Sequence, residues 1–291
     1  MPRLLKIVIM IFTVILLMIN SLKAEGVMMW KAEVNNKNIV LVGSIHMMKE
    51  EFYPLPEEIE KAAQDSDKFV FETDLNSGGS ADLMTFLMQN SMYQDGTTLD
   101  TVLADSTFAL ISQKMDELGL DMNKHLVYKP WYLSLTYTMN RYRKQGYSEQ
   151  LGIDRHFHDL AEEQEKAIGW LEEPLEQMQL LLSLSEIEPN QLISQTIKEH
   201  DNYELNLDNL FKLWLKGDSA KLAELIFSSY EESPKVLDKL VLLRNREWKK
   251  KILELAKDEK NYFIVVGTGH LVGSGNLIEL LESSGVKFKQ Q

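Results

Sequence analysis

Two segments near opposite ends of the chain share one pattern, which constrains the fold more than any other feature. Ile39–His46 and Phe263–His270 each contain four apolar residues, a glycine, two further residues and a histidine. A short, continuously apolar run predicts a strand that is covered on both faces of a sheet. The repetition indicates a duplicated half in which two strands carry equivalent loops.

The residues after the first copy predict a parallel β-α-β unit. Pro54 and Pro56 precede a helix expected over about residues 57–66, because proline suits the first turn of a helix. An apolar strand then ends at Glu72. Two further strands are expected to form a hairpin near the start of the chain, and three more follow later in the sequence. The complete set of expected strands is 27–34, 39–43, 68–72, 166–170, 262–266 and 286–288.

These elements predict an α/β fold, with α+β as the alternative. Apolar residues recur at helical spacing between about residues 80 and 255, which predicts a large helical insertion within the sheet. A last helix is expected over residues 277–283. Because no low-complexity linker or short-period repeat divides the chain, residues 25–291 are expected to form a single domain.

Residues 1–24 predict a secretory signal peptide. A short basic start is followed by an apolar run from Ile7 to Ile19, which is shorter than the about 20 residues that a membrane span needs. Cleavage after Ala24 would release a periplasmic or extracellular protein without a stable membrane span. An uncleaved N-terminal anchor is the alternative.

The composition limits the possible chemistry. The absence of cysteine excludes disulfides, thiolate metal sites and a cysteine nucleophile. The net charge of −13 argues against nucleic acid as a partner, because phosphates require a basic surface. Serine-hydrolase and nucleotide-binding motifs are missing, which disfavours those classes. Any metal must be bound by histidine nitrogen and carboxylate oxygen.

Three residues at expected strand ends form the main candidate site. Ligands of parallel α/β sheets bind beyond the carboxyl ends of the strands, where His46, Glu72 and His270 follow. Two imidazoles and a carboxylate, with one position open, can hold a metal that lowers the pKa of bound water and polarises a carbonyl. The alternatives are ordinary loop histidines and a structural ion pair between Glu72 and an arginine.

Three further residues are weaker catalytic candidates. Asp154 stands at an expected helix start, where helix capping is the alternative. Glu172 follows the strand at 166–170 and can face the same sheet edge. Arg244 lies on a long helix and could bind a substrate carboxylate or an oxyanion, with a salt bridge as the alternative.

The other four histidines carry less weight. His156 and His158 are two residues apart, so on a helix they point to different faces and are not expected to share a metal. His156 could still line the cleft. His125 and His200 have no motif around them and are expected at the surface or at helix ends.

Together the motifs resemble the TraB/PrgY/GumN family, to which the Tiki metalloproteases are related, and the resemblance covers about residues 28–289. The export signal is similar to that of the GumN-like branch. Thr268 replaces an alanine that is common in the family. The motifs that carry the resemblance are Gly43-Ser44-Ile45-His46, Glu72, Gly152-Ile153-Asp154, Leu171-Glu172 with Gln177, Arg244-Asn245 with Trp248, and Gly267-Thr268-Gly269-His270-Leu271-Val272-Gly273.

The resemblance implies an α/β fold and a metal-dependent protease centre. In the Tiki relatives the two Gly-x-x-His motifs and a glutamate form this centre, which maps onto His46, His270 and Glu72, with manganese or cobalt expected and zinc as the alternative. The more distant erythromycin-esterase-like enzymes use a similar histidine and glutamates without a required metal. TraB and PrgY themselves are associated with shutting down a peptide pheromone, by cleavage or by sequestration.

Three functions follow. The first is an exported metal-dependent hydrolase, expected to be a peptidase, with a peptide or small molecule as substrate. In it Glu72 is metal ligand or general base and Arg244 stabilises the oxyanion. The second is a binding protein that sequesters such a ligand without turnover. The third is a metal-free, esterase-like hydrolase with His46 as general base.

Overall fold

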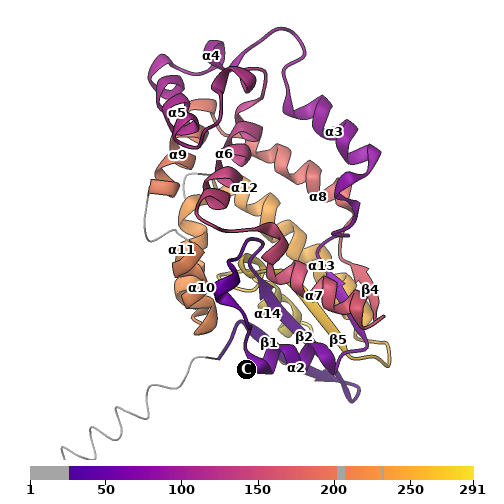
Figure 1. Cartoon of the computed structure of the whole chain (residues 1–291). Helices are drawn as coiled ribbons and strands as arrows, with labels where there is room; N and C mark the ends of the chain where they lie inside the picture. Colours follow the sequence, from indigo (N-terminus) through magenta and orange to yellow (C-terminus); the bar gives the residue numbers. More distant parts are fainter. Residues whose placement is uncertain (1–25, 202–206, 231–232) are drawn as a thin grey trace, which may run out of the picture.

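The computed structural model describes residues 26–201, 207–230 and 233–291. A mixed sheet forms the lower part of the molecule in Figure 1, and most helices of the middle segment are stacked above it. The expected signal peptide over residues 1–24 lies outside the described residues. Within the described part, no helix is both long enough and apolar enough to span a membrane.

The sheet has six strands in the order β4-β3-β5-β2-β1-β6. Strands β2 to β5 are mutually parallel where they pair, whereas β1 is antiparallel to both of its neighbours. This arrangement, with helices inserted between the strands, confirms the expected α/β class. The strands are β1 (Met29–Val34), β2 (Lys37–Ser44), β3 (Lys68–Phe71), β4 (Ala167–Trp170), β5 (Tyr262–Gly267) and β6 (Lys289–Gln290).

The two matching segments lie side by side at the centre of the sheet. Strands β2 and β5 pair in parallel from Ile39 opposite Tyr262 to Ser44 opposite Gly267. Their apolar residues are almost fully buried, as the continuous apolar runs predict. Parallel pairing brings both histidine loops to the same edge of the sheet. The pairing is offset by one residue from the alignment of the two motifs, because Gly43 faces Val266.

The helices are mostly short, and those of the middle segment surround a second apolar core. This core joins α4, α5, α6 and α9 through residues such as Ile111, Leu133 and Ile193. The helices are α2 (Glu57–Gln64), α3 (Ala81–Ser91), α4 (Leu99–Val102), α5 (Asp105–Glu117), α6 (Pro130–Lys144), α7 (Ile153–Glu163), α8 (Pro174–Leu181), α9 (Pro189–Asp201), α10 (Leu207–Leu215), α11 (Ser219–Phe227), α12 (Pro234–Leu237), α13 (Leu243–Leu255) and α14 (Leu277–Glu282).

The first hairpin and the last strand have other boundaries than expected. Only Asn35 and Asn36 turn the first hairpin, both with positive φ, which matches the tight two-residue turns that join twisted strands. The prediction of a last strand at residues 286–288 is wrong, since β6 spans only Lys289–Gln290. The residues before β6 form the turn that ends α14 and are therefore not extended. Gly285 in this turn has a φ of 94°, and the Val286 N–H still bonds the Leu281 carbonyl.

Thr268 links the two histidine loops directly. Its Oγ1 donates a hydrogen bond to the Ser44 carbonyl at 2.9 Å, and the residue is buried. We expect Thr268→Val to lower the free energy of unfolding by about 1 to 2 kcal/mol, because a buried carbonyl loses its partner. Urea unfolding measures this change. Thr85→Val on the exposed side of α3 is the control and should change stability by less than about 0.5 kcal/mol.

Candidate active site

A cavity of about 510 Å³ opens over the carboxyl ends of the central strands. Ser44, Phe71 and Val265 line it at the ends of β2, β3 and β5. Helical residues such as Met139 and Leu180 form the opposite wall, so the cavity lies between the sheet and the helical segment. This is where the topology of a parallel α/β sheet places ligands.

His46 enters this cavity from the loop after β2 and is bonded to Asp154. The ring Nδ1 lies 2.9 Å from Asp154 Oδ2. Asp154 is in the first turn of α7 but does not cap the helix, since the capping position is Gly152. The Ile153 N–H donates to the Ile45 carbonyl at 3.0 Å, which attaches the helix start to the histidine loop. When Nδ1 carries the proton toward the carboxylate, Nε2 is left as the free base of the neutral ring.

The charge of Asp154 shifts the titration of His46. It raises the pKa of the ring above its ordinary value of 6.5, and Glu72 contributes in the same direction, while partial desolvation by the surrounding groups and the charge of Arg244 oppose both. The His46 side chain is 60% exposed, so solvent screens this attraction more strongly than it would for a buried pair. The ring is therefore a stronger base that stays accessible from the cavity, and the neutral form that can accept a proton becomes more populated as the pH rises through this raised pKa.

Arg244, near the start of α13, uses all five of its N–H groups. Nε and Nη2 bond the two oxygens of Glu172 at 3.0 and 2.6 Å, and Nη2 also bonds Glu72 at 2.5 Å. Nη1 bonds the Leu240 carbonyl at 2.9 Å and His270 Nε2 at 3.0 Å. No N–H is left over for a substrate. The expected oxyanion role of Arg244 therefore requires one of these bonds to be exchanged.

Glu72 is buried and bonded through both oxygens. Oε1 accepts from the Gly267 N–H at 2.5 Å, and Oε2 accepts from Gln177 at 3.0 Å as well as from Arg244. Burial acts to raise the pKa of this carboxyl, but Arg244, His46 and the Gly267 N–H outweigh it and lower the pKa to about 2. Glu72 is therefore an anion at neutral pH. The structure contains the ion pair between Glu72 and an arginine that the sequence analysis gave as the alternative to a metal ligand.

His270 is held as a neutral ring. Nδ1 lies 2.6 Å from Asn245 Oδ1, and the amide of Asn245 donates to the Gly275 carbonyl, which assigns the proton to Nδ1. Nε2 then accepts from Arg244. Burial, with Arg244 adding to it, lowers the pKa of His270 to about 3 although Glu72 opposes the shift. The ring also lies against Trp248, with centroids 4.4 Å apart.

Glu172 completes this buried half of the site. Both of its oxygens bond Arg244, and burial raises the pKa of its carboxyl although Arg244 opposes the shift. Its backbone N–H donates to the Glu72 carbonyl at 2.9 Å, so the two glutamates lie side by side at the ends of β3 and β4. Arg244 therefore lies between two carboxylates and a neutral imidazole.

The motif glycines are needed for space rather than for an unusual turn. Gly267 has a φ of −52° and a ψ of 138°, which any residue can adopt. A Cβ at this position would lie 3.0 Å from Glu72 Oε1 and 3.6 Å from His46 Nε2. Gly43 is similar, since its Cβ would lie 2.9 Å from Thr268 Oγ1. These glycines are thus explained by the close approach between the loops and the candidate site residues.

The same geometry tests the expected metal site. Ligands around one tetrahedral ion lie about 3.4 Å apart, given bonds of about 2.1 Å. His270 Nε2 is 3.8 Å from Glu72 Oε1, but in the described part of the chain the three atoms from His46, Glu72 and His270 do not all lie within 4.8 Å of one another. Arg244 also occupies His270 Nε2. In this arrangement the three donors do not fit a metal.

The six residues singled out in the sequence therefore meet at one place. Four of them, His46, Glu72, Asp154 and Arg244, line the cavity, and the other two lie directly behind Arg244. What the sequence did not reveal is the support that Gln177 gives to Glu72 and Asn245 to His270. Both stand within short motifs next to candidate residues, and this proximity was the available signal.

The remaining histidines lie outside the site. His156 Nε2 is 2.8 Å from Glu60, and His156 is not among the residues that line the cavity, so the prediction that it could line the cleft is wrong. His125 and His200 are half-buried residues at the ends of helical turns, as expected, and bond the Asp121 carbonyl and Thr138. His158 is buried on α7.

Comparison with known proteins agrees with the motifs. The sequence profile of the TraB/PrgY/gumN family matches residues 28–290. The chain belongs to this family. It is 24% identical over 249 residues to the proteins named "Uncharacterized protein YbaP" from Escherichia coli K12 and Shigella flexneri, which covers 84% of this chain and 88% of each relative. Among solved structures, none matches the chain with statistical significance.

The Asp154 carboxylate should control the titration of His46. We expect Asp154→Asn to lower the pKa of His46 toward 6.5, because the amide keeps a hydrogen-bond acceptor but removes the negative charge. NMR titration of the ring proton measures the midpoint. Glu163→Gln, at the exposed end of the same helix, should leave it in place. An unchanged midpoint in Asp154→Asn would contradict the pairing.

Arg244 should be important for stability as well as for the site. We expect Arg244→Met to lower the free energy of unfolding by about 3 to 5 kcal/mol, because two carboxylates would stay buried without their cation. Chemical denaturation measures this. Arg246→Met on the same helix is the matched control, since its side chain is 56% exposed and its pair with Asp238 contributes about 1 kcal/mol or less.

Proposed function

We propose that the protein is a hydrolase of amide or ester bonds in which His46 activates the attacking water. The observation that carries this proposal is the His46–Asp154 pair at 2.9 Å, which is open to a cavity at the carboxyl edge of the sheet. A histidine oriented by a carboxylate, with its other nitrogen free, is a general base in several unrelated hydrolases.

The residues around His46 support this role. Its Nε2 and Glu72 Oε1 flank the space that Gly267 leaves open, which is near hydrogen-bonding distance of both atoms. A water in this space would give its proton to Nε2 of the neutral ring as its oxygen attacks the carbonyl carbon, and the charges of Asp154 and Glu72 would stabilise the imidazolium that forms. The imidazolium would then give this proton to the amine or alcohol that leaves as the amide or ester bond breaks. Glu72 itself is a poor base, because its pKa is low and both of its oxygens already accept hydrogen bonds.

Arg244 acts chiefly as the cation that keeps Glu72 ionised beside the cavity. A direct contact between Arg244 and a developing oxyanion is also part of the proposal, and it requires Nη1 to exchange the Leu240 carbonyl or His270 for the substrate oxygen. His270 and Asn245 hold the guanidinium in place from the side opposite the cavity. These groups position the reacting residues without moving protons themselves.

We propose a short peptide or another small molecule as the substrate. The cavity volume falls within the range of about 300 to 1,000 Å³ that is common for such ligands. Its wall from the helical segment is largely apolar, through Met139, Leu180, Leu181 and Leu240, which suits an apolar group beside the bond to be cleaved. We also propose that the protein is exported, because of the pattern of residues 1–24.

A metal-dependent mechanism is the alternative that the family resemblance suggests. Its ligands would be His46, Glu72 and His270, with manganese, cobalt or zinc. It requires His46 to move closer to Glu72 and His270 to release Arg244, so the observed arrangement favours the mechanism without a metal. Sequestration of a ligand without turnover would use the same cavity.

The test is a hydrolysis screen with quenched fluorescent peptides and chromogenic esters, on protein treated with a chelator and checked by elemental analysis. We expect activity to survive metal removal and to fall by a factor of about 100 or more in His46→Ala. Gly267→Ala should also inactivate the protein, because its methyl group fills the space between His46 and Glu72. His156→Ala, on a histidine outside the cavity, should keep full activity.

Each other result points to a different function. Loss of activity after chelation, with recovery in manganese or cobalt, would replace this proposal by the metal-dependent one. Saturable peptide binding without product, in the wild type and in all variants, would indicate sequestration. Full activity in His46→Ala would exclude both mechanisms that depend on this histidine.

A further inference from the structure

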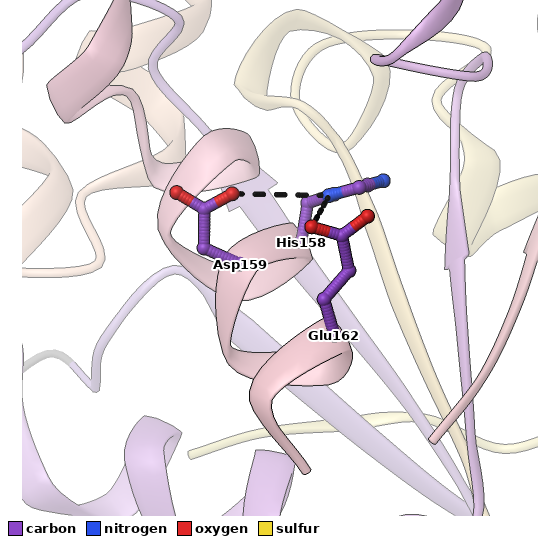
Figure 2. Close-up of side chains that lie close together, drawn as sticks. All are labelled: His158, Asp159 and Glu162. Atoms are coloured by element: carbon purple, nitrogen blue, oxygen red, sulfur yellow. Dashed lines mark ion pairs between the residues drawn. The ribbon is translucent and has the colours of Figure 1, made fainter. Parts of the chain in front are cut away.

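A second group of ionisable side chains lies on α7, one to two turns beyond Asp154. Figure 2 shows that His158 points its Nδ1 toward the carboxylates of Asp159 and Glu162. The three ligand atoms lie within 4.8 Å of one another, and in the described part of the chain no other three His, Asp or Glu residues meet this condition. The candidate active site does not use them.

The unusual member of this group is His158. Its side chain is 3% exposed, and its ring packs against Phe71 with centroids 5.3 Å apart. Nδ1 is fully buried and has no hydrogen-bond partner among the described residues. Buried polar atoms in native proteins nearly always have a partner. The orientation of this nitrogen therefore points to a ligand between the ring and the two carboxylates.

Both carboxylates lie at the same distance from the buried nitrogen of His158. Asp159 Oδ1 and Glu162 Oε2 are each 3.9 Å from His158 Nδ1, which is too long for a direct hydrogen bond. Glu162 uses its other oxygen to accept from Asn76 at 2.8 Å, so Oε2 is turned toward the histidine. The side chains of Asp159 and Glu162 are 45% and 47% exposed, which gives an ion access from solvent.

We propose that His158, Asp159 and Glu162 bind a divalent transition-metal ion. Zinc accepts imidazole nitrogen and carboxylate oxygen at about 2.0 to 2.2 Å, which puts neighbouring donors about 3.4 Å apart. The half-exposed carboxylates need to move by only about 0.5 Å to reach this spacing, and solvent supplies the remaining ligand. The imidazole favours zinc or cobalt over magnesium and calcium, which prefer oxygen ligands alone.

Arg155 competes with such an ion. Its Nε lies 2.8 Å from Asp159 Oδ1, the same oxygen that faces His158, and its Nη1 donates to Asn76. Arg155 also lines the cavity of the candidate active site. An ion that takes Asp159 therefore displaces the guanidinium at the cavity wall. Removing the positive charge of Arg155 should strengthen the binding of the ion.

The experiment is calorimetric titration of the purified protein with zinc and, separately, with magnesium. His46→Ala serves as the background for every variant, so that binding at the candidate active site does not obscure the result. In this background we expect one zinc ion and no measurable magnesium. Adding Glu162→Gln should weaken zinc binding about tenfold or more, given that losing even an outer-shell partner costs about 10- to 100-fold.

Two further variants sharpen the result. Arg155→Gln should tighten zinc binding, because it removes the competing cation from Asp159. Glu163→Gln is the matched control, an exposed acid next to Glu162 that should leave the affinity unchanged. His158→Gln should abolish binding, with circular dichroism to verify the fold. Since Glu162 is half-exposed, its variant keeps the test valid even if His158→Gln does not fold.

The proposal is overturned if the His46→Ala protein binds no zinc, or if Glu162→Gln binds it as tightly as the control. It is also overturned if Arg155→Gln weakens the binding. A zinc affinity that only His270→Ala reduces would locate the ion at the candidate active site instead.

Discussion

The site depends on one buried cation. The guanidinium of Arg244 lies between Glu72 and Glu172, and it also donates to His270 and stacks over Trp248. Two carboxylates in such a dry environment would otherwise be protonated or destabilising. Because these glutamates follow β3 and β4, and the arginine is on α13, this one group connects the end of the sheet to a helix residue that comes 172 residues after Glu72 and 72 residues after Glu172.

This arrangement divides the site into a fixed half and a reactive half. In the fixed half, Glu72 and His270 are each saturated with hydrogen bonds, and their pKa values are shifted so that one is anionic and the other neutral. In the reactive half, His46 is exposed to the cavity, and among the residues that the structure describes its ring is hydrogen-bonded only to Asp154. The chemistry that we propose needs this division, because a general base must be free to exchange its proton while its surroundings keep their charge.

The sequence predicted the sheet and the composition of the site better than it predicted how the site residues are arranged. The apolar runs before Gly43 and Gly267 are long enough to identify two buried strands, and strand ends in parallel sheets share an edge. The contact of Arg244 with His270 depends on helix packing, which local periodicity does not encode. Likewise the role of Gly267 is set by atoms of Glu72 and His46, which are far away in sequence, so local sequence does not predict it.

The position of α7 has a consequence for how the site responds to heat. Its residues Phe157 and Ala161 are fully buried against the sheet, and Gly152 at its start lies so close to the His46 loop that a Cβ there would be 2.5 Å from the His46 carbonyl oxygen. The Asp154 carboxylate is therefore carried by a core element rather than by a mobile loop. The His46–Asp154 pair is thus attached to the core, and we expect it to unfold with the core rather than in an earlier melting step of its own.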